Sequence, residues 1–210
     1  MKILNIEQGS EEWKLARLEK ISGTRLGDAI GTPAKQESLI NELIAERLTG
    51  EPKESYVNLS MARGIEAEEH AIEEYEEMTG EVTDEAGLCV SDKYDWLVNS
   101  PDRLIWDKKG KKIVKGVEVK CPNTDTLIGY VRKGGIPKEY IPQVMSYFLV
   151  NEELKELDFV IYDSRIQAEQ FRLVITNVKR KELPLAEAEE KLLEFYEKWQ
   201  EALRSLNLEI

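Results

Sequence analysis

The chain has 210 residues, of which 41% are hydrophobic and 33% are charged. This is the composition of an ordinary globular protein, and the length predicts a single domain over residues 1–210. No apolar run approaches the ~18–20 residues that a membrane span requires, and residues 1–7 turn acidic too soon for a secretory signal. The two cysteines, Cys89 and Cys121, argue against a disulfide scaffold and a four-cysteine iron–sulfur cluster, and they favour a reducing cytoplasm.

The net charge of −12 argues against a nucleic-acid partner, but the charge is distributed unevenly. Residues 37–85 contain 15 acidic and 3 basic side chains, whereas residues 103–138 contain 10 basic and 3 acidic ones. A polyanion would have to lie along the second stretch. Its lysine-rich part, residues 108–112, can also be interpreted as a solvated hairpin.

Helices are expected in the first part of the chain. Two short ones fall within residues 1–30, and Ser10 caps the first of them. A third is expected over residues 38–48 and is closed by Gly50. A longer acidic helix covers residues 59–79 and ends at Gly80.

Strand signals dominate the segment that follows, which contains four expected strands, over residues 87–91, 96–99, 104–106 and 113–120. Residues 108–112, centred on Gly110, are expected to form the hairpin turn between the last two. Beyond them we expect a helix, two strands and an amphipathic helix, over residues 140–151, 158–163, 170–176 and 185–206. This order predicts an α/β fold in which a mixed central β-sheet is flanked by α-helices.

Two short motifs contain the residues best suited to chemistry. A Ser-Pro-Asp sequence ends in Asp102, and a Glu-Val-Lys sequence occupies residues 118–120. Side chains two apart on a strand share a face, so Glu118 and Lys120 project together, opposite Val117 and Val119. Two acidic oxygen donors and an ammonium around one point suit Mg²⁺ and a phosphodiester. The acid-x-lysine spacing occurs at least five times elsewhere in the chain, so a surface ion pair remains the alternative.

Glu68 is the third carboxylate that we select, because it shares a helical stripe with four apolar residues: Met61, Ile65, Ile72 and Tyr75. An acid on an apolar stripe is costly unless it is paired or binds a metal. The alternatives are that Glu66 or Glu69 has this role, or that none of them does. Gln143, behind Pro142 on the next expected helix, is either a site residue or a surface amide.

Other chemically versatile residues receive structural assignments. His70 is the only histidine, which excludes multi-histidine metal sites and histidine-based catalytic triads, and we expect it on the surface. Cys121 is expected to be a small packed residue. The four tryptophans, Trp13, Trp96, Trp106 and Trp199, are expected to pack in the core or at its edge.

Taken in order, the motifs resemble a known family. They run from residues 7–9, Trp13 and Arg17 through residues 21–24, 49–50 and 63–64, Glu68 and Ala71, residues 100–102 and 118–122, 134–135, Tyr140 and residues 143–144. This series is similar to the phage lambda-type exonucleases, the YqaJ-like branch of the PD-(D/E)XK nuclease superfamily, over residues 7–176.

The resemblance implies roles for particular residues. Asp102 and Glu118 would be the principal Mg²⁺ ligands, and the Val119 carbonyl and Glu68 would complete the shell. Two ions per site are expected, with Mn²⁺ able to substitute. Lys120 would orient the attacking water and stabilise developing charge, with Gln143 in support.

The resemblance also implies a substrate and partners. Arg17 and Thr24 fall where the family grips a terminal 5′ phosphate. We expect a homotrimeric ring around linear double-stranded DNA, digestion of one strand from the 5′ end, and a 3′ overhang for a single-strand annealing protein. The alternatives are a structure- or sequence-specific endonuclease with the same metal site, or a non-catalytic DNA-end-binding recombination module.

The chain departs from the family pattern at three positions. Arg103 replaces the usual glycine after Ser-Pro-Asp, so either the turn differs or Arg103 contacts a phosphate beside the metal. Thr24 replaces the more common serine and keeps the hydroxyl. Pro142 precedes Gln143 and affects where that helix begins.

Overall fold

The computed structural model describes residues 1–53 and 59–208, apart from the side chains of residues 59–62 and 65. The helices along the described chain are α1 (Glu11–Ala16), α2 (Gly23–Ala29), α3 (Pro33–Thr49), α4 (Leu59–Thr79), α5 (Thr124–Lys133), α6 (Ile141–Val150), α7 (Glu169–Arg172) and α8 (Leu185–Ser205). Two 3-10 turns, η1 (Lys138–Tyr140) and η2 (Arg180–Glu182), lie beside α6 and α8. The strands are β1 (Lys2–Leu4), β2 (Leu88–Val90), β3 (Val98–Asn99), β4 (Arg103–Trp106), β5 (Ile113–Lys120), β6 (Glu156–Tyr162) and β7 (Leu173–Lys179).

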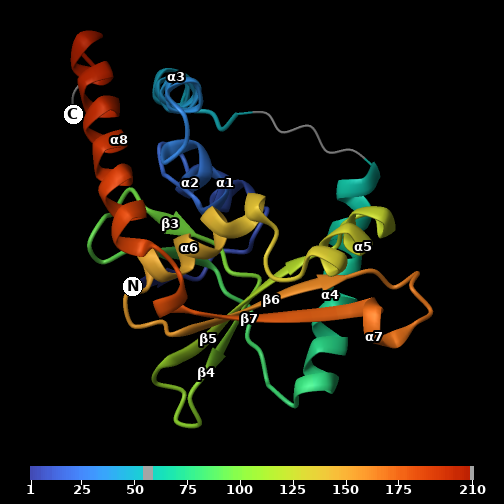
Figure 1. The fold of residues 1–210 in the computed structure, drawn as a ribbon. Helices are drawn as coiled ribbons and strands as arrows, with labels where there is room; N and C mark the ends of the chain where they lie inside the picture. The colour runs from blue at the N-terminus through green and yellow to red at the C-terminus, as the bar shows by residue number, and fades with distance from the viewer. Residues whose placement is uncertain (54–58, 209–210) are drawn as a thin grey trace.

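The strands form two sheets, with the orders β1-β2-β3 and β4-β5-β6-β7. In the larger sheet β5 and β6 run parallel, whereas β4 with β5 and β6 with β7 are antiparallel. Figure 1 shows these strands crossing the centre of the molecule, with helices around them. The expected mixed sheet flanked by helices is therefore confirmed.

The larger sheet is covered on both faces, because alternate residues of its strands join different apolar clusters. Val117, Val119 and Val160 pack with Ile72 and other residues of α4. Phe159 and Ile161, their neighbours on β6, pack instead with α6. Strand β5 is thus buried on both sides, and any polar side chain on it needs partners. Strand β5 contains the Glu-Val-Lys motif.

Several expected elements have different limits in the structure. The prediction missed β1, which is only three residues long and pairs with the distant β2, and it missed α5, which contains Gly129 and Thr126. Helix α3 begins at Pro33, because proline suits a first helical turn. Strand β7 begins at Leu173, since the residues before it form the short helix α7.

Turn chemistry explains the connections next to the motifs. Gly110, with φ of 63°, allows the turn between β4 and β5 that the sequence predicts. Pro142 lies in the first turn of α6, where it costs no helical hydrogen bond. Arg103 is not among the described residues with positive φ, so its replacement of glycine imposes no backbone strain. In the described part of the chain, no helix has the length and apolar character needed to cross a membrane.

Candidate active site

Asp102 and the Glu-Val-Lys motif lie together because β4 and β5 pair directly. Arg103, the residue after Asp102, is opposite Val117 in this pair. The backbone N–H of Val119 donates to Oδ2 of Asp102 at 2.7 Å. Asp102 is buried, and Glu118 is completely so. The two carboxylates predicted from sequence are therefore neighbours at the end of one strand pair.

Three side chains donate hydrogen bonds to the buried Glu118 carboxylate. Lys120 pairs with Oε1, and Nε2 of Gln143 donates to the same oxygen at 2.5 Å. The hydroxyl of Tyr147 donates to Oε2 at 2.5 Å. The structure therefore places Gln143 beside Glu118, and not on the surface as a solvated amide. Sequence reasoning missed Tyr147, although it lies four residues after Gln143 and therefore on the same face of α6.

Gly116 makes room for this tyrosine. A Cβ atom at position 116 would lie 2.9 Å from Cδ1 of Tyr147, closer than carbon atoms can pack without displacement. The absence of a side chain on β5 therefore allows the Tyr147 ring to reach Glu118. A glycine inside a predicted strand is a known signal for such a close approach.

Burial and closely spaced charges together determine the electrostatics of the site. Burial raises the pKa of Asp102 well above its ordinary value, and the charge of Glu118 raises it further. Burial also raises the pKa of Glu68. For Lys120, burial alone would lower the pKa, but the charges of Glu118 and Asp102 outweigh it and raise the pKa. Lys120 is thus held in its charged form beside two carboxylates.

A cavity of about 810 Å³ opens beside Asp102, and its walls include Trp13, Glu68, Glu69 and Arg103. Glu68 is half-buried, and the charges of Lys120, Arg103 and Glu118 all act on it. Glu69 is instead engaged by Arg103, and Glu66 is exposed. The expected stripe includes buried Ile72 and Tyr75, whereas the side chains of Met61 and Ile65 lie outside the described residues.

Arg17 and Thr24 occupy different surroundings. The Arg17 guanidinium lies 3.8 Å from the centre of the Trp13 ring, and it lines a cavity of about 730 Å³ with Arg25. Burial lowers the pKa of Arg17 to about 10, and Arg25 contributes in the same direction. Thr24 is exposed, lies near Ser22 with 3.1 Å between the hydroxyl oxygens, and does not line this cavity.

Trp13 connects the two cavities, since it lines both. Its indole N–H donates to Oγ of Ser100 at 2.8 Å, next to the Ser-Pro-Asp turn. Trp13 was expected only to pack in the core or at its edge, whereas it also lines both cavities and hydrogen-bonds to Ser100. Trp96 and Trp199 do belong to the core, as predicted.

The remaining candidates behave as expected from sequence. His70 is exposed and its nearest charged partner is Glu73, at 3.3 Å. Cys121 is half-buried, and burial raises the pKa of its thiol to about 12. Neither supplies a nucleophile for the site.

The oxygen atoms that the site offers are of the type that binds a divalent cation. Carboxylate oxygens are the ligands that Mg²⁺ prefers, and Asp102, Glu118 and Glu68 lie near enough for their charges to interact. Across residues 1–53 and 59–208, however, no three acidic, histidine or cysteine side chains form a group that could hold an ion by themselves. A cation here would also depend on a main-chain oxygen such as the Val119 carbonyl.

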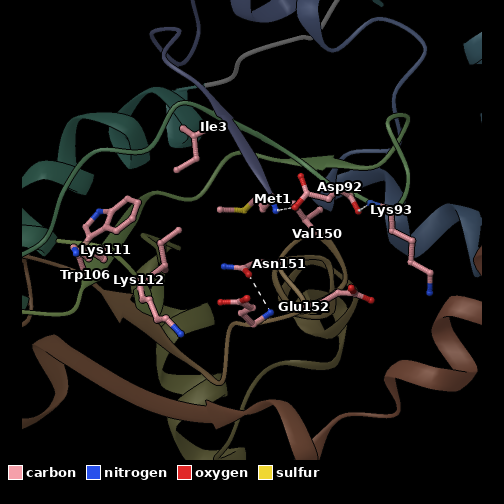
Figure 2. Close-up of a pocket in the computed structure, with 13 residues that line it drawn as sticks. Met1, Ile3, Asp92, Lys93, Trp106, Lys111, Lys112, Val150, Asn151 and Glu152 are labelled. Atoms are coloured by element: carbon pink, nitrogen blue, oxygen red, sulfur yellow. Dashed lines mark hydrogen bonds and ion pairs between the residues drawn. The ribbon is translucent and has the colours of Figure 1, made fainter. Parts of the chain in front are cut away.

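A further cavity of about 380 Å³ lies near the N-terminus (Figure 2). Its walls include Met1, Trp106, Lys111, Lys112 and Asn151, and the N-terminal amine pairs with Asp92. None of the residues selected from the motifs lines it. Glu68, Asp102 and Arg103, which were selected from the motifs, line the Asp102 cavity instead.

The comparisons with known proteins relate the chain to a family and to solved structures. A model of the YqaJ-like viral recombinase domain matches residues 12–153. An alkaline exonuclease (LHK-Exo) from Laribacter hongkongensis is 32% identical, with a TM-score of 0.84 over 94% of this chain and 96% of that one, and its structure in complex with dAMP matches equally. A phage-related exonuclease from Haemophilus somnus 129PT, 18% identical, is similar in fold, with a TM-score of 0.60 over 89% of this chain and 96% of that one. Among curated proteins there is no match.

The family model covers more than half of the chain, and the Laribacter protein matches nearly all of it. The chain therefore belongs to the YqaJ-like viral recombinase family, the lambda-type branch of the PD-(D/E)XK superfamily that its motifs resemble.

Proposed function

We propose that this protein is a DNA exonuclease that hydrolyses phosphodiester bonds of linear duplex DNA from 5′-phosphorylated ends and depends on Mg²⁺, with Mn²⁺ as a substitute. The observation that carries the proposal is the convergence of Asp102, Glu118 and Lys120 at the end of the β4–β5 pair. The family and the names of the related structures support DNA as the substrate.

The chain's own side chains supply a consistent set of roles. Asp102 and Glu118, with the Val119 carbonyl and Glu68, would hold one or two divalent cations. These cations would neutralise charge on the scissile phosphate and make hydroxide available. Lys120 places a fixed positive charge beside the reacting group without reorganisation. Gln143 orients Glu118 through its hydrogen bond.

Recognition of the 5′ end is assigned to the cavity around Arg17. The Nε atom of Arg17 is buried and has no hydrogen-bond partner among the described residues. A buried donor without a partner costs free energy, and a terminal phosphate would satisfy it. The family resemblance gives Thr24 the same role of binding the 5′ phosphate. Thr24 is exposed and does not line the cavity, so its hydroxyl would have to reach the phosphate from outside.

We further propose a homotrimeric ring that encloses the duplex and passes a 3′ overhang to a single-strand annealing protein. The uneven charge supports this arrangement, because residues 103–138 are strongly basic in an acidic chain. A ring would gather this basic stretch inside and leave the acidic surface outside. The molar mass in solution tests the ring, with three chains per particle expected.

The deciding experiment compares three DNA substrates in the presence of Mg²⁺: a linear duplex with 5′ phosphates, the same duplex with 5′ hydroxyls, and a covalently closed circle. We expect fast release of 5′ nucleotides from the first, slow release from the second and none from the circle. Cleavage of the circle would favour the endonuclease alternative. Binding of ends without any acid-soluble product would favour the non-catalytic module.

A further inference from the structure

Arg103 connects the metal-binding end of β4 to helix α4. Its side chain is only 9% exposed. Nη1 donates to the carbonyl oxygen of Asp102 at 2.8 Å. Nη2 donates to both carboxylate oxygens of Glu69, at 2.7 and 2.8 Å, and Glu85 lies 4.0 Å from it. The guanidinium therefore holds one acidic residue of α4 against the chain directly after Asp102.

Arg103 makes its ion pair with only one of the two neighbouring acids of α4, Glu68 and Glu69. Neighbouring residues of an α-helix point about 100° apart, so Glu68 and Glu69 reach the Asp102 cavity, which both of them line, from different directions. The Glu69 carboxylate, 66% exposed, is held by Arg103. Glu68 is left facing the site, where the charges of Lys120 and Glu118 act on it.

We propose that Arg103 is a positioning residue that acts through Glu69. The ion pair keeps the Glu69 carboxylate on the Arg103 guanidinium and leaves Glu68 as the acid of α4 that is available to the divalent cation. This inference rests on the proposed function, because it gives Glu68 a part in holding the cation. It also replaces a direct phosphate contact by Arg103, since a phosphate at Nη2 would have to displace a bidentate carboxylate.

The variant Glu69→Gln distinguishes a positioning role of Arg103 from direct phosphate binding. Glu69 is exposed, so we expect this substitution to leave folding intact. If Arg103 acts by positioning, loss of the ion pair weakens Mn²⁺ binding to the DNA-free protein about 10-fold, measured by titration calorimetry. The kcat falls as well, and KM for linear duplex stays unchanged. If Arg103 instead binds phosphate, Glu69→Gln frees it, so KM falls while Mn²⁺ affinity and kcat stay at the wild-type level. That second result would overturn the inference.

Two controls sharpen the test. Glu74→Gln breaks another ion pair of the same helix, in which Nε of Arg172 donates to Glu74 at 2.5 Å, and it should leave Mn²⁺ affinity unchanged. An equal loss there would mean general loosening of α4 and would refute the specific role. Arg103→Gln combined with Glu69→Gln should lose no more affinity than Arg103→Gln alone, because loss of the guanidinium already removes the ion pair; additive losses would contradict the proposal. A wild-type protein that binds no Mn²⁺ would overturn the proposed function itself.

Discussion

Tyr147→Phe tests whether the buried hydrogen bonds around Glu118 stabilise the fold. The substitution keeps the ring, which packs in the cluster between α6 and β6, and removes only the hydroxyl that donates to Oε2 of Glu118 at 2.5 Å. A hydrogen bond to a charged group contributes about 1.5–3 kcal/mol, and its loss leaves a buried carboxylate oxygen without that donor. We expect the free energy of unfolding to fall by about 2 kcal/mol.

Urea unfolding measures this loss. With a slope of about 2 kcal/mol per molar urea, the midpoint should shift down by about 1 M. Tyr130→Phe is the matched control, because its hydroxyl donates to Glu139 at 2.7 Å in an exposed setting. The same deletion there should cost less than about 0.5 kcal/mol. Equal midpoint shifts in the two variants would refute the argument that burial gives the Glu118 hydrogen bond its strength.

Three further predictions concern catalysis, end recognition and pH. Lys120→Ala should lower turnover of linear duplex by ~10²-fold or more while DNA binding survives; near-normal digestion rates would remove Lys120 from the chemistry. Arg17→Ala should abolish the preference for 5′-phosphorylated over 5′-hydroxyl ends, and unchanged discrimination would show that another residue reads the phosphate. Burial alone would raise the pKa of Asp163, but hydrogen bonds led by Arg165 outweigh it and lower the pKa to about 2. Because the pKa of Asp163 is lower in the folded state, its ionised carboxylate stabilises the fold at pH values above the pKa of the unfolded state. This stabilisation is lost as the pH falls toward 2. Asp163→Asn should therefore cost about 2 kcal/mol of unfolding free energy at pH 7 and almost nothing near pH 2, and a pH-independent difference would contradict this.

The central sheet and its motif residues could be predicted from sequence because strand periodicity and motif order point the same way. Val117 and Val119 indicated one buried face of β5, and the structure packs both against α4. The opposite face could not be assigned so simply. Glu118 is also buried there, and two of its three partners, Gln143 and Tyr147, come from α6, which follows β5 only after an unpredicted helix.

Features that depend on contacts between distant segments escaped sequence reasoning. Strand β1 exists only through pairing with β2, and three residues carry too little pattern to identify it. Tyr147 could not be selected from the sequence, because the space that Gly116 leaves for its ring depends on the packing of α6 against β5. The choice among the acids of α4 likewise required the partner of Arg103, which lies 34 residues from Glu69.

The dense set of donors around Glu118 has a practical consequence for anyone preparing an inactive enzyme. Replacing Glu118 would remove the shared hydrogen-bond acceptor of Lys120, Gln143 and Tyr147 at once, so the resulting protein would combine damaged folding with lost chemistry. Lys120, whose side chain keeps 23% exposure, can be truncated while Gln143 and Tyr147 still hold the carboxylate. Complexes trapped with intact substrate should therefore be built on the lysine variant.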